Sequence, residues 1–438
     1  MYEKINRLAD DLKDKLVAYR RDFHKYAESG WFEMRTTSLV ARRLADLGYE
    51  VLTGRDVCLA ESRMGLPAEQ ELENSYVRAK EQGADPEFLE ATKGGFTGAL
   101  GILRCGEGPV VALRFDIDAL GVVEDESDEH RPWREGFSSV NRGMMHACGH
   151  DGHTTIGLGV AEVLMALKDR LRGTVKLIFQ PAEEGVRGAK SIVDKGHLDG
   201  VDYVLACHIN EILADGDRVP DIMAGSGGSF ATTKLDAFFY GKSAHAAGSP
   251  QDGKNALAAV VTAAQNLLAI PRHSKSDTRV NVGTLNAGSG RNVIPEFAKM
   301  ELEIRGKTSE GNTYMEDWAR RIIKTAAEMH DCTSEIKMMG AAFQLESDQA
   351  FMELIRDVCE QDLKTVTVHS ELRRESGGSE DFSYMMKRVQ DQGGQASMLR
   401  ILTETAAVGH NKRYDFDDED ALPKAVKALS AVVCKLMS

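Results

Sequence analysis

The N-terminal fifty residues carry hydrophobic side chains at the spacing of a helix. Apolar residues recur every three or four positions between Ile5 and Phe23, at Ile5, Leu8, Leu12, Leu16, Tyr19 and Phe23. This period places them on one face, so the pattern predicts one helical stripe buried against a core. The spacing returns from Ser38 to Leu47 and stops at Gly48, a residue type that commonly ends helices in the left-handed conformation.

Short apolar runs then alternate with helical segments. The runs cover residues 110–115, 175–180 and 201–207, and the helical segments between them cover 154–171 and 188–195. Strands that alternate with helices predict an α/β fold with a doubly wound, mostly parallel sheet. Functional sites of such sheets lie at the carboxyl ends of strands. Ionisable side chains follow each predicted strand: Asp116 and Asp118, Glu183 and Glu184, and His208.

A different pattern follows a glycine-rich hinge at residues 225–228. The expected order is strand, helix, strand, strand, helix, strand, over residues 231–240, 253–269, 279–285, 297–304, 313–330 and 334–339. This βαββαβ order predicts a ferredoxin-like domain inserted into the first one. We expect residues 1–226 and 346–438 to form the first domain and 227–345 the inserted one. Residues 53–93 are charged and predict a further insertion, with a helix or two packed on the outside.

Composition and charge narrow the possible functions. The 438 residues include 54 Lys and Arg against 68 Asp and Glu, a formal net charge of −14. Because a protein needs a basic face to bind nucleic acid, this charge argues against a nucleic-acid partner. No run of eighteen apolar residues indicates a membrane span, and the N-terminus lacks the apolar core of a signal peptide. Seven scattered cysteines without framework spacing indicate a reducing compartment. These features predict a cytoplasmic protein.

The segment 145–153 gathers one thiol and three imidazoles. It reads Met-His-Ala-Cys-Gly-His-Asp-Gly-His and contains His146, Cys148, His150 and His153. Thiolate and imidazole together suit zinc, manganese or another transition ion better than calcium or magnesium. The glycine between Cys148 and His150 allows a tight turn that aims both side chains at one point. A buried free cysteine beside ordinary histidines is the alternative, and other segments must supply ligands to exclude it.

Later segments supply these ligands. The candidates are Cys148, His150, Glu184, His208 and His410. Five ligands are too many for one tetrahedral ion but suit two ions, roughly 3.5–4 Å apart, that share a ligand; we expect Cys148 to be the bridge. Glu183 then suits a general base, and Asp118 would orient a ligating imidazole through its free N–H. The pattern leaves open whether His146 and His153 support the site or are purely structural.

Four segments resemble motifs of the M20 metallopeptidase family, in the branch of aminoacylase-like and auxin-conjugate amidohydrolases. They cover residues 114–120, 146–153, 179–185 and 380–382. The resemblance runs from about residue 15 to the C-terminus, and the octapeptide around Cys148 is highly specific. Gly121 stands where this branch usually has proline, beside the site, but it replaces no ligand. Residues 53–93 are absent from most of the branch.

The resemblance implies a zinc-exopeptidase-like fold whose inserted domain acts as a lid and dimerises. It assigns Cys148, His150, Glu184, His208 and His410 as metal ligands and Glu183 as the base. It also implies that His245 reaches across a dimer toward the scissile carbonyl, and that Asn292 and Arg305 hold the substrate carboxylate. Two divalent ions are implied, with manganese favoured and zinc possible. The partner would be a second copy or a homologous second subunit.

Whole-chain likeness within the family favours cleavage of the amide that joins p-aminobenzoate to glutamate. Two alternatives stay open: a broad N-acyl-amino-acid amidohydrolase, and a non-catalytic subunit that supports an active relative. The intact Glu183 and the complete ligand set count against the second. A zinc nucleoside deaminase is excluded because no Pro-Cys-x-x-Cys follows the histidine motif.

Overall fold

The computed structural model describes residues 1–375 and 377–438. The chain forms two compact units. The first comprises Met1–Gly227, Glu346–Glu375 and Asp381–Ser438, and the second comprises Gly228–Leu345 with residues 377–380. In the described residues, no helix combines the length and the apolarity needed to cross a membrane.

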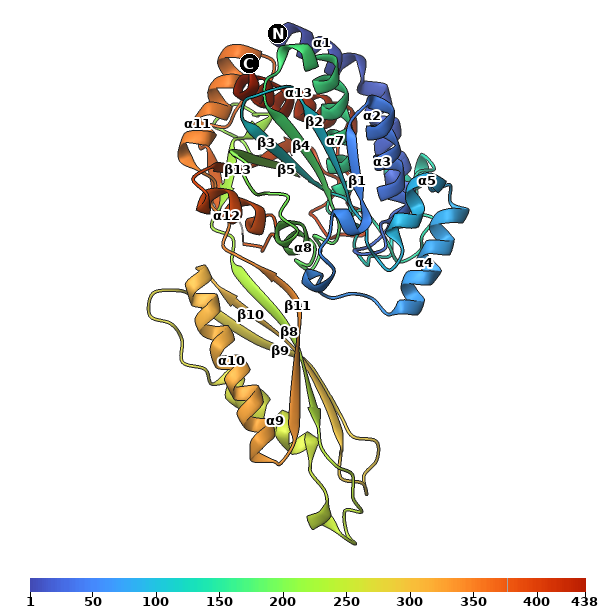
Figure 1. Cartoon of the computed structure of the whole chain (residues 1–438), viewed down its shortest axis with the longest axis vertical. Coiled ribbons are helices and arrows are strands. Elements are labelled where there is room, and N and C mark those ends of the chain that lie inside the picture. The colour runs from blue at the N-terminus through green and yellow to red at the C-terminus, as the bar shows by residue number, and fades with distance from the viewer. Residues whose placement is uncertain (376) are drawn as a thin grey trace. The chain divides into compact units, whose positions relative to one another are not determined.

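A seven-stranded sheet forms the centre of the first unit (Figure 1). Its strands, in spatial order, are β1 (Glu50–Thr53), β2 (Ala99–Arg104), β4 (Thr174–Gln180), β3 (Val110–Asp116), β5 (Tyr203–Glu211), β13 (Gln395–Thr403) and β6 (Ile222–Met223). The four strands β4, β3, β5 and β13 are parallel, and the other three pair antiparallel. The mostly parallel sheet confirms the predicted fold class. β13, which the sequence pattern did not reveal, lies beside β5 inside this sheet.

The chain path places a switch point at β3. From β3 it runs through α7 (His150–Ala166) to β4 on one side, and from β4 through α8 (Ala189–Asp194) to β5 on the other side. Because such crossovers are right-handed, the two helices cover opposite faces of the sheet. The crevice at a switch point is where open α/β sheets bind their ligands. The carboxyl end of β3, at Asp116, therefore lies where a site is expected.

Helices from both ends of the chain cover α7. They are α1 (Tyr2–Asp11), α2 (Lys13–Lys25), α3 (Met34–Leu47) and α13 (Asp418–Met437). The predicted single stripe from Ile5 to Phe23 is thus split into two helices at Leu12, which nevertheless keeps helical backbone angles. α3 ends at Gly48, whose φ of 91° is the left-handed conformation predicted for it. α7 itself is buried along almost its whole length.

Several further elements of this unit are short. They are α6 (Arg131–Arg134), α11 (Gln349–Asp357), a π-helix (Val358–Leu363), α12 (Ser383–Asp391), and the parallel pair β7 (Gly225–Gly227) and β12 (Arg373–Glu375).

Residues 53–93 do not lie wholly on the outside, contrary to expectation. They contain α4 (Glu69–Glu81) and α5 (Pro86–Leu89), which pack on α3, and bury Val57, Met64 and Leu72. Arg187 connects this segment to the turn after β4, because its guanidinium donates to the carbonyls of Gly65 (3.0 Å) and Glu184 (2.9 Å). The insertion therefore supports a strand end that carries a candidate ligand.

The second unit has the predicted βαββαβ order. Its elements are β8 (Ala231–Tyr240), α9 (Ala256–Leu268), β9 (Thr278–Ala287), β10 (Phe297–Gly306), α10 (Ser309–Met329) and β11 (Thr333–Ala342). The strands pair antiparallel in the order β11-β8-β10-β9, which is the ferredoxin-like arrangement. Alternate residues of β10, from Ala298 to Ile304, are buried beneath the two helices, as expected for a sheet with one covered face.

Candidate metal centre

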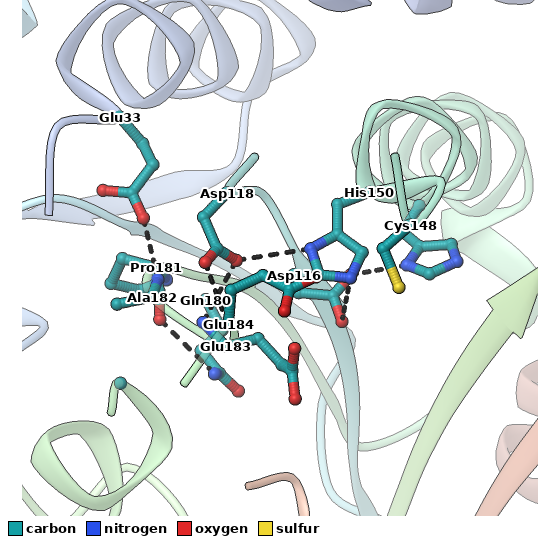
Figure 2. Close-up of polar contacts among 12 residues, drawn as sticks. Glu33, Asp116, Asp118, Cys148, His150, Gln180, Pro181, Ala182, Glu183 and Glu184 are labelled. Atoms are coloured by element: carbon teal, nitrogen blue, oxygen red, sulfur yellow. Dashed lines mark hydrogen bonds and ion pairs between the residues drawn. The ribbon is translucent and has the colours of Figure 1, made fainter. Parts of the chain in front are cut away.

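Asp118 ties the ends of two parallel strands together (Figure 2). It follows β3, and its carboxylate accepts the backbone N–H groups of Glu183 (3.0 Å) and Glu184 (2.9 Å) in the turn after β4. On the other side of this turn, the carboxylate of Glu33 accepts the N–H of Ala182 at 2.7 Å. These hydrogen bonds hold the backbone of both glutamates at the carboxyl edge of the sheet. Residues of an exposed turn without such bonds would not be fixed in this way.

Hydrogen bonds set the tautomers of two imidazoles. Nδ1 of His150 lies 3.3 Å from Oδ1 of Asp118, and Nδ1 of His208 lies 2.7 Å from the carbonyl oxygen of Ile209. Because both oxygens only accept, each Nδ1 carries a proton, which leaves Nε2 as the ring nitrogen that can bind a metal. Burial keeps the His208 ring neutral by lowering its pKa, whereas His150 would lose its second proton on binding metal, since Asp116 and Asp118 raise its pKa despite burial. Nε2 of His208 lies 3.5 Å from Sγ of Cys148. This is the state that a metal-binding imidazole needs.

Two of the groups of donor atoms that could hold a metal share Cys148, and Glu183 lies in a further group with His150 and Glu184. Of the two that share Cys148, one is Cys148, His150 and His208, the other is Cys148, Glu184 and His410, and within each the donor atoms lie within 4.8 Å of one another. Within the described chain, Nε2 of His150 and Oε1 of Glu184 are buried without a hydrogen-bond partner; their ion-pair partners, Asp116 at 3.7 Å and His410 at 3.6 Å, lie beyond hydrogen-bond distance. Buried polar atoms rarely stay unpaired because of the cost, and a cation would satisfy both. The residues present fit a pair of metal ions.

Burial is the largest cause of the pKa shifts of Cys148, Glu184 and His208. It raises the pKa of the Cys148 thiol to about 12, and the charge of Glu184 adds to this effect. It also raises the pKa of Glu184 to about 7, although His150 opposes the change. Burial lowers the pKa of His208 to about 3. A bound divalent cation would stabilise the thiolate and the carboxylate, so metal binding is coupled to release of their protons.

His153, whose role the sequence left open, has both ring nitrogens engaged. Nδ1 lies 2.5 Å from Oδ1 of Asp116, and Nε2 accepts the backbone N–H of Ile209 at 2.9 Å. It therefore has no lone pair left for a metal and links α7 to the ends of β3 and β5. His146 is buried, and burial lowers the pKa of its imidazole to about 4, so it is neutral.

The position of His208 differs from the prediction. We expected it just after a strand, but β5 continues to Glu211, so His208 lies within it. The reason is the neighbouring strands: β3 pairs with β5 only as far as Ala206, whereas β13 pairs along the full length to Glu211. His208 thus lies two residues beyond the part of β5 that pairs with β3, and its Nε2 still reaches Cys148.

In the second unit, the structure brings His245 and Asn292 together but not Arg305. Ala246 N–H donates to the carbonyl of Asn292 at 3.1 Å, and Nδ1 of His245 accepts the N–H of Gly248 at 2.9 Å. The ring therefore carries its proton on Nε2, which can donate. Arg305 pairs with Thr232 near the start of β8, at the opposite end of the sheet. Its guanidinium forms two 3.0 Å bonds with the carboxylate of Glu303.

Sequence reasoning missed two arginines in this region. A pocket of about 260 Å³ is lined by Cys148 and His208 and also by Arg374 and Arg400. Neither arginine lies in a recognisable motif, and each is more than 160 residues away from His208 along the chain. No local pattern could have shown that they share its pocket.

Comparisons with known proteins agree with this geometry. The model of peptidase family M20/M25/M40 matches residues 112–435. Indole-3-acetyl-aspartic acid hydrolase of Enterobacter agglomerans is 47% identical over 429 residues, covering 97% of each chain. A p-aminobenzoyl-glutamate hydrolase subunit of Escherichia coli (strain K12) is 46% identical over 429 residues, covering 98% of this chain and 97% of its own.

A solved structure is also similar over the whole chain. The aminobenzoyl-glutamate utilization protein from Klebsiella pneumoniae superposes with a TM-score of 0.84 at 39% identity, covering 98% of each chain. The family match spans the segments that carry all the donor atoms described above. The chain therefore belongs to peptidase family M20/M25/M40 and is a metallo-amidohydrolase.

Proposed function

We propose that this protein hydrolyses p-aminobenzoyl-glutamate to p-aminobenzoate and glutamate at a dinuclear metal site. The observation that carries the chemistry is the pair of overlapping donor groups that share Cys148, next to the anchored Glu183. The substrate follows from relatives at 46–47% identity whose names specify amides of glutamate or aspartate. An indole-acetyl-aspartate conjugate is the second candidate, because the relative named for it is equally similar.

The site residues take the following roles in this proposal. Cys148, His150, Glu184, His208 and His410 would hold two divalent ions, with manganese favoured over zinc and Cys148 common to both donor groups. When bound, such ions would lower the pKa of a water and polarise the scissile carbonyl. Glu183 accepts the proton of the attacking water and returns it to the leaving nitrogen. Asp118 keeps His150 in the tautomer that binds metal.

The assembly is also part of the proposal. We propose a cytoplasmic dimer, with a second copy or a homologous partner chain, in which Nε2–H of His245 donates to the oxyanion in the neighbouring chain. Asn292, which lies beside His245 in the second unit, would bind the substrate with it. Arg305, although implied by the family resemblance, pairs with Glu303 here, so its role would require that pair to open.

One assay tests the function. Purified protein, loaded with manganese or with zinc, is offered p-aminobenzoyl-glutamate, indole-3-acetyl-aspartate and hippurate. We expect p-aminobenzoyl-glutamate to have the largest kcat/KM and hippurate, which lacks an acidic amino acid, to be at least about 10-fold poorer. Equal rates on all three would favour a broad N-acyl-amino-acid amidohydrolase. Inactivity of the metal-loaded protein on all three would contradict the proposal.

Metal content tests the ligand assignment independently of turnover. We expect two ions per chain after reconstitution, and Cys148→Ala should hold at most one, because both donor groups lose the shared thiolate. Cys207→Ala is the matched control, since that buried thiol belongs to neither donor group. Elemental analysis of both variants decides the matter. An unchanged metal content in Cys148→Ala would overturn the assignment.

Mixing of two inactive variants tests the dimer. Chains with Glu183→Ala and chains with His245→Ala are each expected to be inactive as homodimers. A mixed dimer contains one site with both residues intact, so mixing after dissociation should restore part of the activity. Failure to recover activity, in mixed dimers that native mass spectrometry detects, would mean that His245 does not serve the neighbouring chain.

A further inference from the structure

The pocket beside the candidate metal centre has an unusual concentration of positive charge. Cys148 and His208 line it together with Arg374 of β12 and Arg400 of β13. Arg400 is tethered, since its Nε donates to Oγ of Ser226 at 3.2 Å and its Nη2 donates to the carbonyl of Arg374 at 3.3 Å. Both partners are neutral oxygens, so these bonds position the guanidinium without cancelling its charge.

Neither arginine has a carboxylate partner in the described part of the chain. This contrasts with neighbouring arginines of the same unit: Arg373 pairs with Glu346, and Arg114 pairs with Asp116 and Asp381. Glu211 also lines the pocket, yet no ion pair among the described residues joins it to Arg374 or Arg400. Burial, and then the nearby charge of Arg374, lower the pKa of Arg400. Two like charges held together in this way favour an added anion.

We propose that Arg374 and Arg400 bind a carboxylate of the acidic amino acid in the substrate and thereby select glutamate or aspartate conjugates. The inference rests on the proposed function, which places an N-acyl amino acid at this site. A guanidinium suits the task because its planar fork donates to two carboxylate oxygens at once. The pocket lies directly beside the donor atoms of Cys148 and His208, so a substrate with its amide at the metals can place a carboxylate there.

Either carboxylate of the glutamate portion could be the ligand, and substrate analogues distinguish the two. p-Aminobenzoyl-glutamate has both carboxylates, p-aminobenzoyl-glutamine lacks the side-chain charge, and p-aminobenzoyl-isoglutamine lacks the α-charge. The three share one acyl group and nearly one shape. Any difference between them therefore reports which carboxylate the arginines contact.

The variants are Arg374→Met and Arg400→Met, with Arg373→Met as the matched control. Arg373 belongs to the same strand, but its side chain points to the opposite face and pairs with Glu346. On p-aminobenzoyl-glutamate, we expect each pocket variant to lower kcat/KM roughly 10- to 100-fold, mainly through KM, as loss of a hydrogen bond to a charged group does. Arg373→Met should retain the wild-type value.

The analogues give a result that a merely structural role cannot produce. On the monoamide that lacks the contacted carboxylate, the pocket variants should equal wild type, because that interaction is already absent. Losses of the same size on all three substrates would overturn the inference. Arg400 is tethered and partly buried, so Arg400→Met could fail to fold. Arg374→Met changes an exposed position and then provides the test by itself.

A binding measurement separates this inference from the proposed function. If wild type hydrolyses none of the three amides, the proposed function fails. Calorimetric titration of the metal-loaded protein with free glutamate and with glutamine still tests the arginines. We expect glutamate to bind more tightly than glutamine in wild type, and Arg374→Met to remove most of that difference. Equal affinities in wild type, or a difference that survives in Arg374→Met, would overturn the carboxylate assignment.

Discussion

Glu183→Gln is expected to lower kcat roughly 10²–10⁴-fold, as removal of a general base usually does, while metal content stays at the wild-type value. The amide keeps the size of the side chain but cannot accept the proton of the attacking water. The backbone N–H of Glu183 still donates to Asp118 at 3.0 Å, so the turn after β4 should remain in place. Steady-state kinetics together with elemental analysis of the same sample measures both quantities.

Glu184→Gln provides the comparison, because Glu184, unlike Glu183, belongs to one of the two donor groups that share Cys148, so its loss should lower metal content as well as rate. A near-normal kcat in Glu183→Gln would require a different base. Asp381 is a poor substitute: its carboxylate accepts from Gln180 (2.8 Å), from Arg114 (3.2 Å) and from the backbone N–H groups at the start of α8. Both carboxylate oxygens of Asp381 already accept hydrogen bonds and are therefore not available to a water.

Arg20→Met is expected to lower the free energy of unfolding of the first unit by about 3–5 kcal/mol, the range for removing one partner from a buried ionic cluster. Arg20 is fully buried in α2 and contacts Asp151 (2.8 Å), Asp415 (2.8 Å) and Asp418 (3.3 Å). Without its charge, carboxylates from α7 and the C-terminal segment are left close together in the interior. Urea denaturation followed by tryptophan fluorescence measures the change.

Lys13→Met is the control on the same helix. Lys13 pairs with Glu419 at 3.0 Å, but both side chains are largely exposed, and such pairs contribute little because water and salt screen them. The control should unfold at the wild-type denaturant concentration. If Arg20→Met behaved like the control, the three aspartates would have to be compensated by their other partners, such as Arg131 and His24.

The sequence by itself determined the features that local pattern and residue chemistry encode. Strands that alternate with helices predicted the mostly parallel sheet, and the βαββαβ order predicted the second unit. The thiol and imidazoles of residues 145–153 indicated a metal site with soft ligands. The family that this segment resembles is confirmed by the comparisons. Each of these signals lies within a short segment, because a period of two or 3.6 residues and a ligand spacing are local properties.

Only the tertiary structure decided what depends on distant segments. Strand pairing with β13 placed His208 inside β5, and Asp118 determined which nitrogen of His150 faces the donors. The engagement of both nitrogens of His153 and the meeting of Arg374 and Arg400 beside Cys148 also appeared only in the fold. Sheet register and crossover connections bring these residues together across gaps of tens to hundreds of positions, and no local pattern in the chain recorded these particular contacts.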